Sequence, residues 1–230
     1  MPPPATPQRP AALRTLLQLA DSALPVGGFA HSDGVEAAAG LLGEEGPDLP
    51  ALLAAHAALS VATGDAAFVR AGHRAAAEGG DRLASTARED LATRVARLQR
   101  DASLAVGASF LRVARQIATA DEDAALAGIA AALGDATPRA TVFGAVARAL
   151  GVHADDAVDA HLYVTLAGMA NAAVRLSACS ATEAQRALRR AMLAAPAASA
   201  LDERDFGFAS PLLEIAAMRH ETRAGRLFAS

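Results

Sequence analysis

Apolar residues recur at three- and four-residue intervals along most of this chain, whereas the alternating runs typical of strands are scarce. Because that spacing lines one face of an α-helix, the pattern predicts a nearly all-helical protein. Much of the apolar content is alanine, which favours helices and close helix packing. No gap between the helical patterns has the length and polarity of an interdomain linker. We therefore expect an all-α, single-domain helical bundle of about ten helices.

Glycine and proline mark most of the expected helix ends. Residues 1–10 are rich in proline and are expected to form a disordered N-terminal tail, with the helical domain spanning 11–230. The uninterrupted pattern from Ser85 to Ala118 is the longest, and its arginines predict a central helix with a solvated basic stripe. The expected helices are 11–23, 33–42, 49–63, 66–78, 81–119, 121–133, 139–150, 154–178, 181–195 and 211–223.

The composition argues against several classes of function and partner. A net charge of −4 and few aromatic residues do not suit a nucleic-acid-binding protein. All 21 basic residues are arginine, so the lysine of a P-loop NTPase or of a Schiff-base enzyme is absent from the chain. With Cys179 alone, no signal-peptide pattern, and the longest apolar stretch (162–174) too short to span a bilayer, we expect a soluble protein in the cytoplasm.

The residues that most often carry catalysis form no recognisable constellation. The histidines lack the spacing of a zinc-binding helix, and the neighbours of Cys179 do not form a known nucleophile turn. Adjacent carboxylates fall at expected loops or helix starts, where they favour the helix dipole. We predict no catalytic residue and no metal ligand, although a site assembled from distant histidines and carboxylates stays open. The histidines are His31, His56, His73, His153, His161 and His220.

The segment 20–36 contains the most distinctive local pattern, ADSALPVGGFAHSDGVE. An apolar helical pattern stops at Pro25, and two glycines then permit backbone angles that other residues avoid. Asp33 and Glu36 have the spacing of a capping box, which predicts that a second helix begins there. From the residues alone, this segment is an interhelical turn without chemistry.

The C-terminal segment ends on the two large apolar residues Leu227 and Phe228, after a charged run that begins at Arg219. Chain ends fray unless something holds them. These side chains can therefore dock either into the protein's own core or onto a partner, and the sequence leaves that choice open.

Together these segments resemble the urease accessory protein family UreF. The stretch 21–36 is similar to the N-terminal motif of that family, and 210–230 is similar to its C-terminal ending. The match continues in the same order between them, through Arg88-Glu89, Phe143-Gly144 and Tyr163. The resemblance covers about residues 13–230.

The resemblance implies a non-catalytic helical protein that acts in assembling the nickel centre of urease. It implies a homodimer that bridges a UreD/UreH-type accessory protein and the GTPase UreG, regulates GTP hydrolysis and serves GTP-dependent nickel delivery to apo-urease. No cofactor is expected to be tightly bound, with nickel present only in transit, and neither nucleic acid nor membrane is an expected partner. The implied partner-binding residues are Tyr163, His220, Glu221, Arg223, Arg226, Leu227 and Phe228. The implied structural motif residues are Pro25, Gly27, Gly28, Ser32, Gly34, Glu36, Arg88 and Glu89.

The chain departs from the family pattern at three places. Asp33 stands where glycine or glutamine is more usual, and Thr137-Pro138-Arg139 replaces a stretch that often carries histidine, which predicts surface charges particular to this chain. The segment 177–185 lacks the usual proline and glycine, which predicts a tighter helical junction. Two alternative functions stay open: a helical ligand-binding regulator with an apolar pocket, and a metalloenzyme that uses scattered histidines.

Overall fold

The computed structural model describes residues 9–42, 48–196, 215, 218–219 and 227–228. In this part of the chain the structure contains helices and no strand, which confirms the all-helical prediction. The elements are α1 (Arg9–Leu19), the 3-10 turn η1 (Gly28–Ala30), α2 (Val35–Leu42), α3 (Leu49–His56), the π-helix η3 (Ala57–Asp65), α4 (Ala66–Glu78), α5 (Gly80–Thr93), α6 (Arg97–Ile117), α7 (Ala120–Leu133), α8 (Arg139–Ala149), α9 (Ala154–Arg175) and α10 (Ala181–Ala194).

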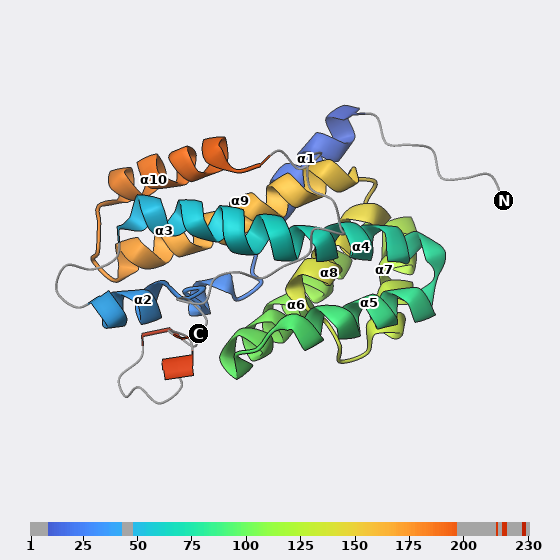
Figure 1. Ribbon diagram of the computed structural model, residues 1–230. Coiled ribbons are helices and arrows are strands. Elements are labelled where there is room, and N and C mark those ends of the chain that lie inside the picture. The colour runs from blue at the N-terminus through green and yellow to red at the C-terminus, as the bar shows by residue number, and fades with distance from the viewer. Residues whose placement is uncertain (1–8, 43–47, 197–214, 216–217, 220–226, 229–230) are drawn as a thin grey trace.

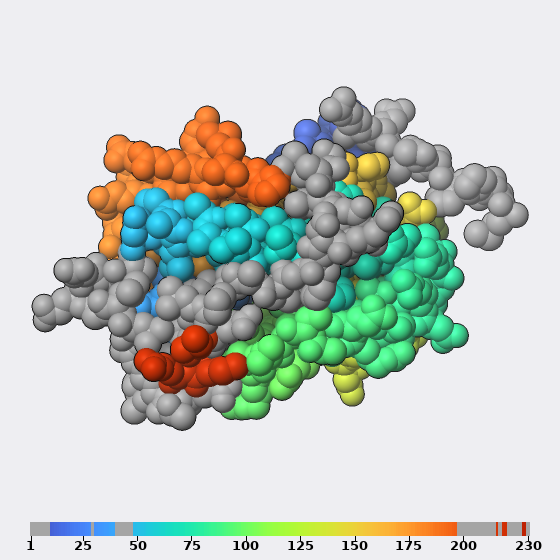
Figure 2. Space-filling model, viewed as in Figure 1, coloured from blue at the N-terminus to red at the C-terminus, as the bar shows by residue number. Residues whose placement is uncertain are grey.

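One continuous helix, formed by α3, η3 and α4, runs through the middle of the molecule (Figure 1). At its α3 end it packs against α10, and α9 contacts all three of its parts. At its α4 end it is crossed by α8, in the most extensive contact of the structure, and is flanked by α5. The space-filling view shows α3 and α10 side by side on one face, with described C-terminal residues at the surface below them (Figure 2).

The buried side chains form two apolar clusters. The first lies between α4, α5, α6, α7, α8 and the beginning of α9. The second lies between α2, α3, the rest of α9 and α10, and it includes Phe228 from the C-terminal segment. The long helix and α9 contribute to both clusters. The expectation of a single domain over 11–230 stays a prediction.

The α4–α8 crossing depends on two glycines. A Cβ atom on Gly144 would overlap the carbonyl oxygen of Val69, and one on Gly72 would overlap that of Thr141. The two backbones therefore touch at the crossing, which a larger residue at either glycine would prevent. This contact fixes the position of α8 and of Arg139 at its first turn.

The predicted helices match the structure with three exceptions. The expected break at Gly64-Asp65 is absent, because the chain continues through it as a π-helix. The helix expected over 81–119 is divided between α5 and α6. The first helix, α1, begins at Arg9, inside the expected N-terminal tail, and ends at Leu19, before the expected end at residue 23. Residues 1–8, the expected break at 43–47 and most of the helix expected over 211–223 lie outside the described residues.

The helix from Leu49 to Glu78 is 30 residues long and apolar enough to cross a membrane by length and composition alone. Half of the residues in its most apolar stretch are buried inside the structure. The sequence did not reveal this helix because Gly64-Asp65 suggested an interruption. Its packing against α9 and α10 accounts for its apolar composition.

Candidate functional site

The segment between α1 and α2 is a compact turn. Gly27 has a left-handed φ of 77° and leads directly into η1. Side chains are strained in that conformation, so glycine is the residue that fits. A second left-handed glycine, Gly34 with φ 92°, comes immediately before α2. The predicted turn and helix restart are confirmed.

The capping box predicted for Asp33 and Glu36 does not form. The backbone N–H of Glu36 donates instead to the hydroxyl of fully buried Ser32, with N and Oγ 3.4 Å apart. Asp33 has a left-handed φ of 48°, and its Oδ2 accepts a hydrogen bond from Nη1 of Arg139 at 3.2 Å. A hydrogen bond from a charged guanidinium is stronger than one from a backbone N–H. This difference explains why the Asp33 side chain pairs with Arg139 of α8 instead of capping α2.

The pair Asp33–Arg139 joins two of the departures from the family pattern. The side chains are 24% and 19% exposed, so their charges lie mostly inside the protein. The expectation that these positions give the surface charges particular to this chain stays a prediction. Burial alone would raise the pKa of the Asp33 carboxyl, but the Arg139 guanidinium and His56 hold it below its ordinary value.

Glu36, in the first turn of α2, contacts the C-terminal segment. Its Oε1 accepts the backbone N–H of Leu227 at 2.8 Å, and its Oε2 accepts that of Phe228 at 2.9 Å. The Phe228 side chain is only 3% exposed and belongs to the second apolar cluster. The guanidinium carbon of Arg175 lies 4.4 Å from the centre of the Phe228 ring. The N-terminal motif and the end of the chain thus meet in space.

A cavity of about 220 Å³ lies between this turn, α8, α9 and the C-terminal segment. Its wall includes Asp33, Arg139, Tyr163, Arg175 and Phe228. Tyr163 is 43% exposed, so it also contributes to the outer surface. The wall is completed by Ala20, Asp21, Ser22, Leu24, Val26, Gly28, His31, Val106, Val164, Ala167, Gly168, Asn171, Ala172 and Gln185.

A network of buried charged groups lies behind Arg139. The Nη2 of Arg94 is 2.9 Å from Oδ1 of Asp65, and its Nε is 3.0 Å from Oδ1 of Asp90. The Nε2 of His161 is 3.1 Å from Oδ2 of Asp65, and Nη2 of Arg139 is 3.8 Å from the same oxygen. The network connects η3, α5, α8 and α9: Asp65 ends η3, Asp90 lies in α5, Arg139 begins α8 and His161 lies in α9.

The pKa shifts show which charges this network maintains. Burial opposes ionisation of Asp65, but Arg94 and His161 outweigh it and hold the pKa of that carboxyl far below its ordinary value. Burial also opposes the charge of Arg94, yet Asp90 and Asp65 raise its pKa. For His161, burial dominates and lowers the pKa below 6.5. At neutral pH the Asp65 carboxylate and the Arg94 guanidinium are therefore charged, and the His161 imidazole beside them is neutral.

Arg94 corrects the predicted central helix and its basic stripe. It lies just after α5, with φ −87° and ψ 98°, where the chain leaves the helical conformation before α6 begins. Its side chain is 13% exposed, unlike that of Arg97, which is 61% exposed. The interruption brings Arg94 to Asp65, so this arginine is a buried structural cation rather than a solvated one.

The π-helix lies next to the same network. His56 comes just before η3, and Asp65 is its last residue. The Nδ1 of His56 is buried without a hydrogen-bond partner, and burial lowers the pKa of this imidazole. Among the described residues, no group of three or more histidine, cysteine or acidic side chains is placed to hold a metal ion.

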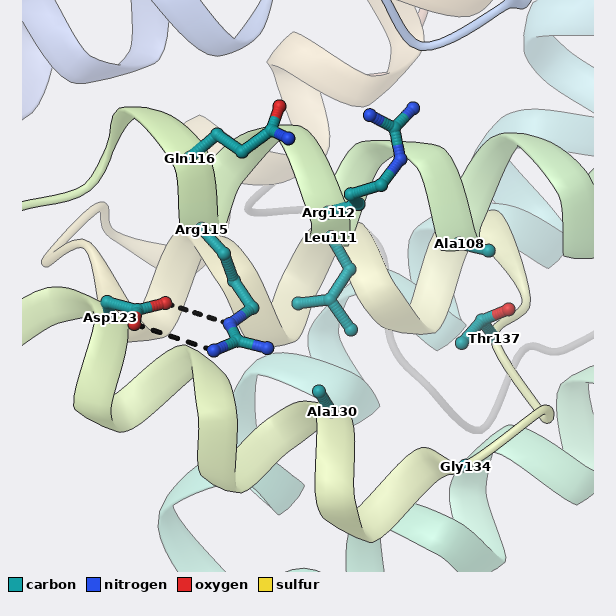
Figure 3. A pocket seen from close by; sticks show the side chains of 9 residues that line it. All are labelled: Ala108, Leu111, Arg112, Arg115, Gln116, Asp123, Ala130, Gly134 and Thr137. Atoms are coloured by element: carbon teal, nitrogen blue, oxygen red, sulfur yellow. Dashed lines mark hydrogen bonds and ion pairs between the residues drawn. The ribbon is translucent and has the colours of Figure 1, made fainter.

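A second, larger hollow of about 430 Å³ lies between α6, α7 and the loop after α7 (Figure 3). Arg115 donates to Asp123 across it, with Nε and Oδ1 2.8 Å apart. The Arg112 and Gln116 side chains point away from that pair in Figure 3. This hollow contains none of the residues that the sequence marked as a site.

The other residues that the sequence marked do not lie together in the structure. Arg88 and Glu89 are exposed on α5 and do not line the cavity. Pro25 is exposed in the turn, and Gly28 lines the cavity. His220, Glu221, Arg223 and Arg226 lie outside the described residues.

The junction predicted for the segment 177–185 is short. α9 ends at Arg175, Ser177 takes a left-handed φ of 57°, and α10 begins at Ala181 behind a capping box between Ser180 and Glu183. Without proline or glycine the chain still turns, as the departure from the family pattern led us to expect.

Comparison with known proteins identifies the family. The UreF family model matches residues 46–192. The chain belongs to the UreF family. It is 34% identical over 222 residues to the urease accessory protein UreF of Paenarthrobacter aurescens (strain TC1), covering 94% of this chain and 96% of that protein. It is also 35% identical over 222 residues to UreF of Mycobacterium sp. (strain JLS), covering 95% and 99%, and 31% identical over 234 residues to UreF of Chromohalobacter salexigens, covering 99% and 98%.

This membership confirms the resemblance that the two terminal motifs suggested, and it identifies the chain as an accessory protein rather than an enzyme. The sequence identified Glu36 as a residue of the UreF motif, but it did not predict that Glu36 contacts the C-terminal segment. Sequence analysis missed Asp65, Arg94, Arg139, His161 and Arg175 as members of this region. Only the four-residue spacing of Asp90 and Arg94 gave a signal, and that spacing is equally common on exposed helices.

Proposed function

We propose that this UreF protein is a non-catalytic scaffold for maturation of the urease nickel centre. In this proposal it bridges a UreD/UreH-type accessory protein and the GTPase UreG, and it regulates GTP-dependent delivery of nickel to apo-urease. It acts as a homodimer in the cytoplasm, with nickel as cargo rather than as a tightly bound cofactor. Its membership of an accessory-protein family supports this proposal.

The observation that carries the proposal is the surface beside the docked C-terminal residues. Leu227 is 55% exposed although its neighbour Phe228 is buried. Tyr163, which lines the same cavity as Phe228, is 43% exposed. Large exposed side chains on a well-packed part of the structure are typical anchors of protein interfaces. We assign Leu227 and Tyr163 to the surface that contacts the UreD/UreH-type partner.

Co-purification with the UreD/UreH-type protein tests this surface. We expect Leu227→Asp and Tyr163→Ala each to lower recovery of the partner by about tenfold or more, because hot-spot residues contribute about 2 kcal/mol or more. Deletion of residues 219–230 should abolish recovery. Ile117→Asp is the matched control, since Ile117 is equally exposed at 43% but lies outside the cavity wall.

Unchanged recovery with all three variants, each retaining its helical circular dichroism, would disprove the assigned surface. A second experiment then adds UreG and GTP to the two-protein complex. The scaffold proposal requires a three-protein complex in which the rate of GTP hydrolysis differs from that of UreG alone. Failure of UreG to join the complex contradicts the bridging role.

The cavity makes a ligand-binding regulator the second candidate. Its wall combines apolar side chains with converging polar groups, as ligand pockets do. Its volume of about 220 Å³ lies below the range of roughly 300–1,000 Å³ typical of small-molecule pockets. A size this small favours the scaffold over the regulator.

A further inference from the structure

Glu36 recognises the backbone of the C-terminal segment rather than its side chains. The two carboxylate oxygens accept from two consecutive backbone N–H groups, those of Leu227 and Phe228, at 2.8 and 2.9 Å. The Glu36 residue is only 6% exposed, so its charge is largely removed from water. A buried carboxylate is unfavourable unless hydrogen-bond donors satisfy it, and here the end of the chain supplies two of them.

Phe228 provides the second part of the contact. Its ring enters the second apolar cluster, which contains Leu162 and Leu166 of α9. Arg175, near the end of the same helix, covers the ring at 4.4 Å. A cation above an aromatic face is attracted by the ring quadrupole. The site thus combines a backbone acceptor, an apolar recess and a cation, contributed by α2 and α9.

The seated Phe228 also forms part of the cavity wall, together with Arg175 and Tyr163. Withdrawal of Phe228 would remove its ring from that wall. The contact between Glu36 and the chain end therefore determines how enclosed the cavity is.

We infer that Glu36, Arg175 and the apolar recess of α9 form a peptide-binding site whose occupant is the chain's own Leu227-Phe228, and that this contact acts as a latch that closes the cavity. The latch needs no other protein, so it stands or fails independently of the proposed role in urease maturation. The peptide-binding site should prefer an extended segment that offers two consecutive backbone N–H donors and an aromatic side chain.

Amide hydrogen exchange of the full-length protein tests the latch directly. We expect the amides of Leu227 and Phe228 to exchange more slowly than their intrinsic unprotected rates, because both are hydrogen-bonded to Glu36. Glu36→Gln replaces one acceptor oxygen with an amide donor that faces a backbone N–H. Exchange at both positions should then accelerate by about tenfold or more, since a charge-assisted hydrogen bond at a buried site is lost.

Glu89→Gln is the control, because Glu89 is an exposed carboxylate on α5 that accepts from Ser85 rather than from the chain end. It should leave both amides unchanged. Intrinsic exchange rates at Leu227 and Phe228 in the unmodified protein would overturn the inference. Equal protection in the unmodified and Glu36→Gln proteins would also overturn it.

Tyr163 gives a second measurement, because it is the single tyrosine of a chain without tryptophan and it lines the cavity. Phe228→Ala keeps Glu36 intact and removes the ring from the wall. We expect acrylamide to quench Tyr163 fluorescence more strongly in Phe228→Ala and in Glu36→Gln than in the unmodified protein. Unchanged quenching in Phe228→Ala, with the helical content preserved, would disprove closure of the cavity by the chain end.

Discussion

Two buried carboxylate sites in this protein are satisfied in different ways. Asp65 and Asp90 are neutralised by Arg94, with His161 and Arg139 beside Asp65, and these groups lie in core helices or directly after one. Glu36 instead accepts backbone N–H groups from a segment 191 and 192 positions away in the chain. The core network fixes helices to one another, whereas the Glu36 contact fixes Leu227 and Phe228 to the first turn of α2. Buried charge therefore stabilises the helix packing at the first site, whereas at Glu36 it binds the backbone of a distant segment.

The largest expected effect comes from removing the central cation of the network. Arg94→Ala leaves Asp65 and Asp90 without their main partner, and we expect a loss of about 3–5 kcal/mol in the free energy of unfolding. Urea denaturation followed by far-ultraviolet circular dichroism measures this loss. Arg97→Ala is the control, because Arg97 pairs with Asp101 at the exposed surface and should contribute about 0–1 kcal/mol.

A loss of the same small size for both arginine variants would contradict the structural role of the network. If Arg94→Ala does not fold, Arg94→Lys retains the charge but not the planar fork that contacts two carboxylates. It should fold with an intermediate loss of stability. The result shows how far the fold depends on the geometry of the guanidinium.

The second prediction tests the α4–α8 crossing, which positions Arg139 in the network. Gly144→Ala places a methyl group against the carbonyl oxygen of Val69, and we expect a loss of about 1–3 kcal/mol in the same urea measurement. Gly128→Ala, on the exposed side of α7 with open space around it, should instead stabilise the protein by about 0.5–1 kcal/mol. Equal effects at the two glycines would refute the close crossing.

The sequence predicted the helices well because their apolar spacing and glycine punctuation are local signals. It failed at Arg94 and at Gly64-Asp65, where tertiary partners decide the outcome. Arg94 interrupts the helical pattern to reach Asp65, which is 29 positions away. Likewise, the sequence marked both Glu36 and Phe228, but no local rule connects residues so far apart. Asp33 and Arg139 show the same limit, since each departs from the family pattern alone and only the fold pairs them.

The third prediction concerns the dependence of stability on pH, to which His161 and Asp65 contribute in different pH ranges. Burial lowers the pKa of His161 in the folded protein, so the unfolded chain binds a proton first as the pH falls below about 6.5. Stability should therefore decrease below that pH, and it should decrease further near pH 4, where the unfolded chain protonates Asp65 before the folded protein does.

Urea denaturation between pH 8 and pH 5 provides the test of the histidine contribution. His161→Gln removes one titrating group, so the dependence on pH should weaken by up to about 1.4 kcal/mol per pH unit. The lowered pKa values of His31, His56 and His73 leave a residual slope of the same sign. A steeper slope in His161→Gln, or a stability that rises as the pH falls from 7 to 5, would rule out a neutral buried His161.

The smallest expected effect comes from Arg175, whose contribution to the C-terminal latch can be measured separately from that of Glu36. Arg175 is exposed, and a cation–π contact at an exposed site contributes about 0.5–1 kcal/mol. Arg175→Gln should therefore accelerate exchange of the Phe228 amide by only about two- to fivefold. Arg186→Gln, an exposed arginine on α10, should not change it. If Arg175→Gln instead loosens the chain end as much as Glu36→Gln, side-chain contacts rather than backbone recognition hold the segment, and the contrast between the two buried carboxylate sites disappears.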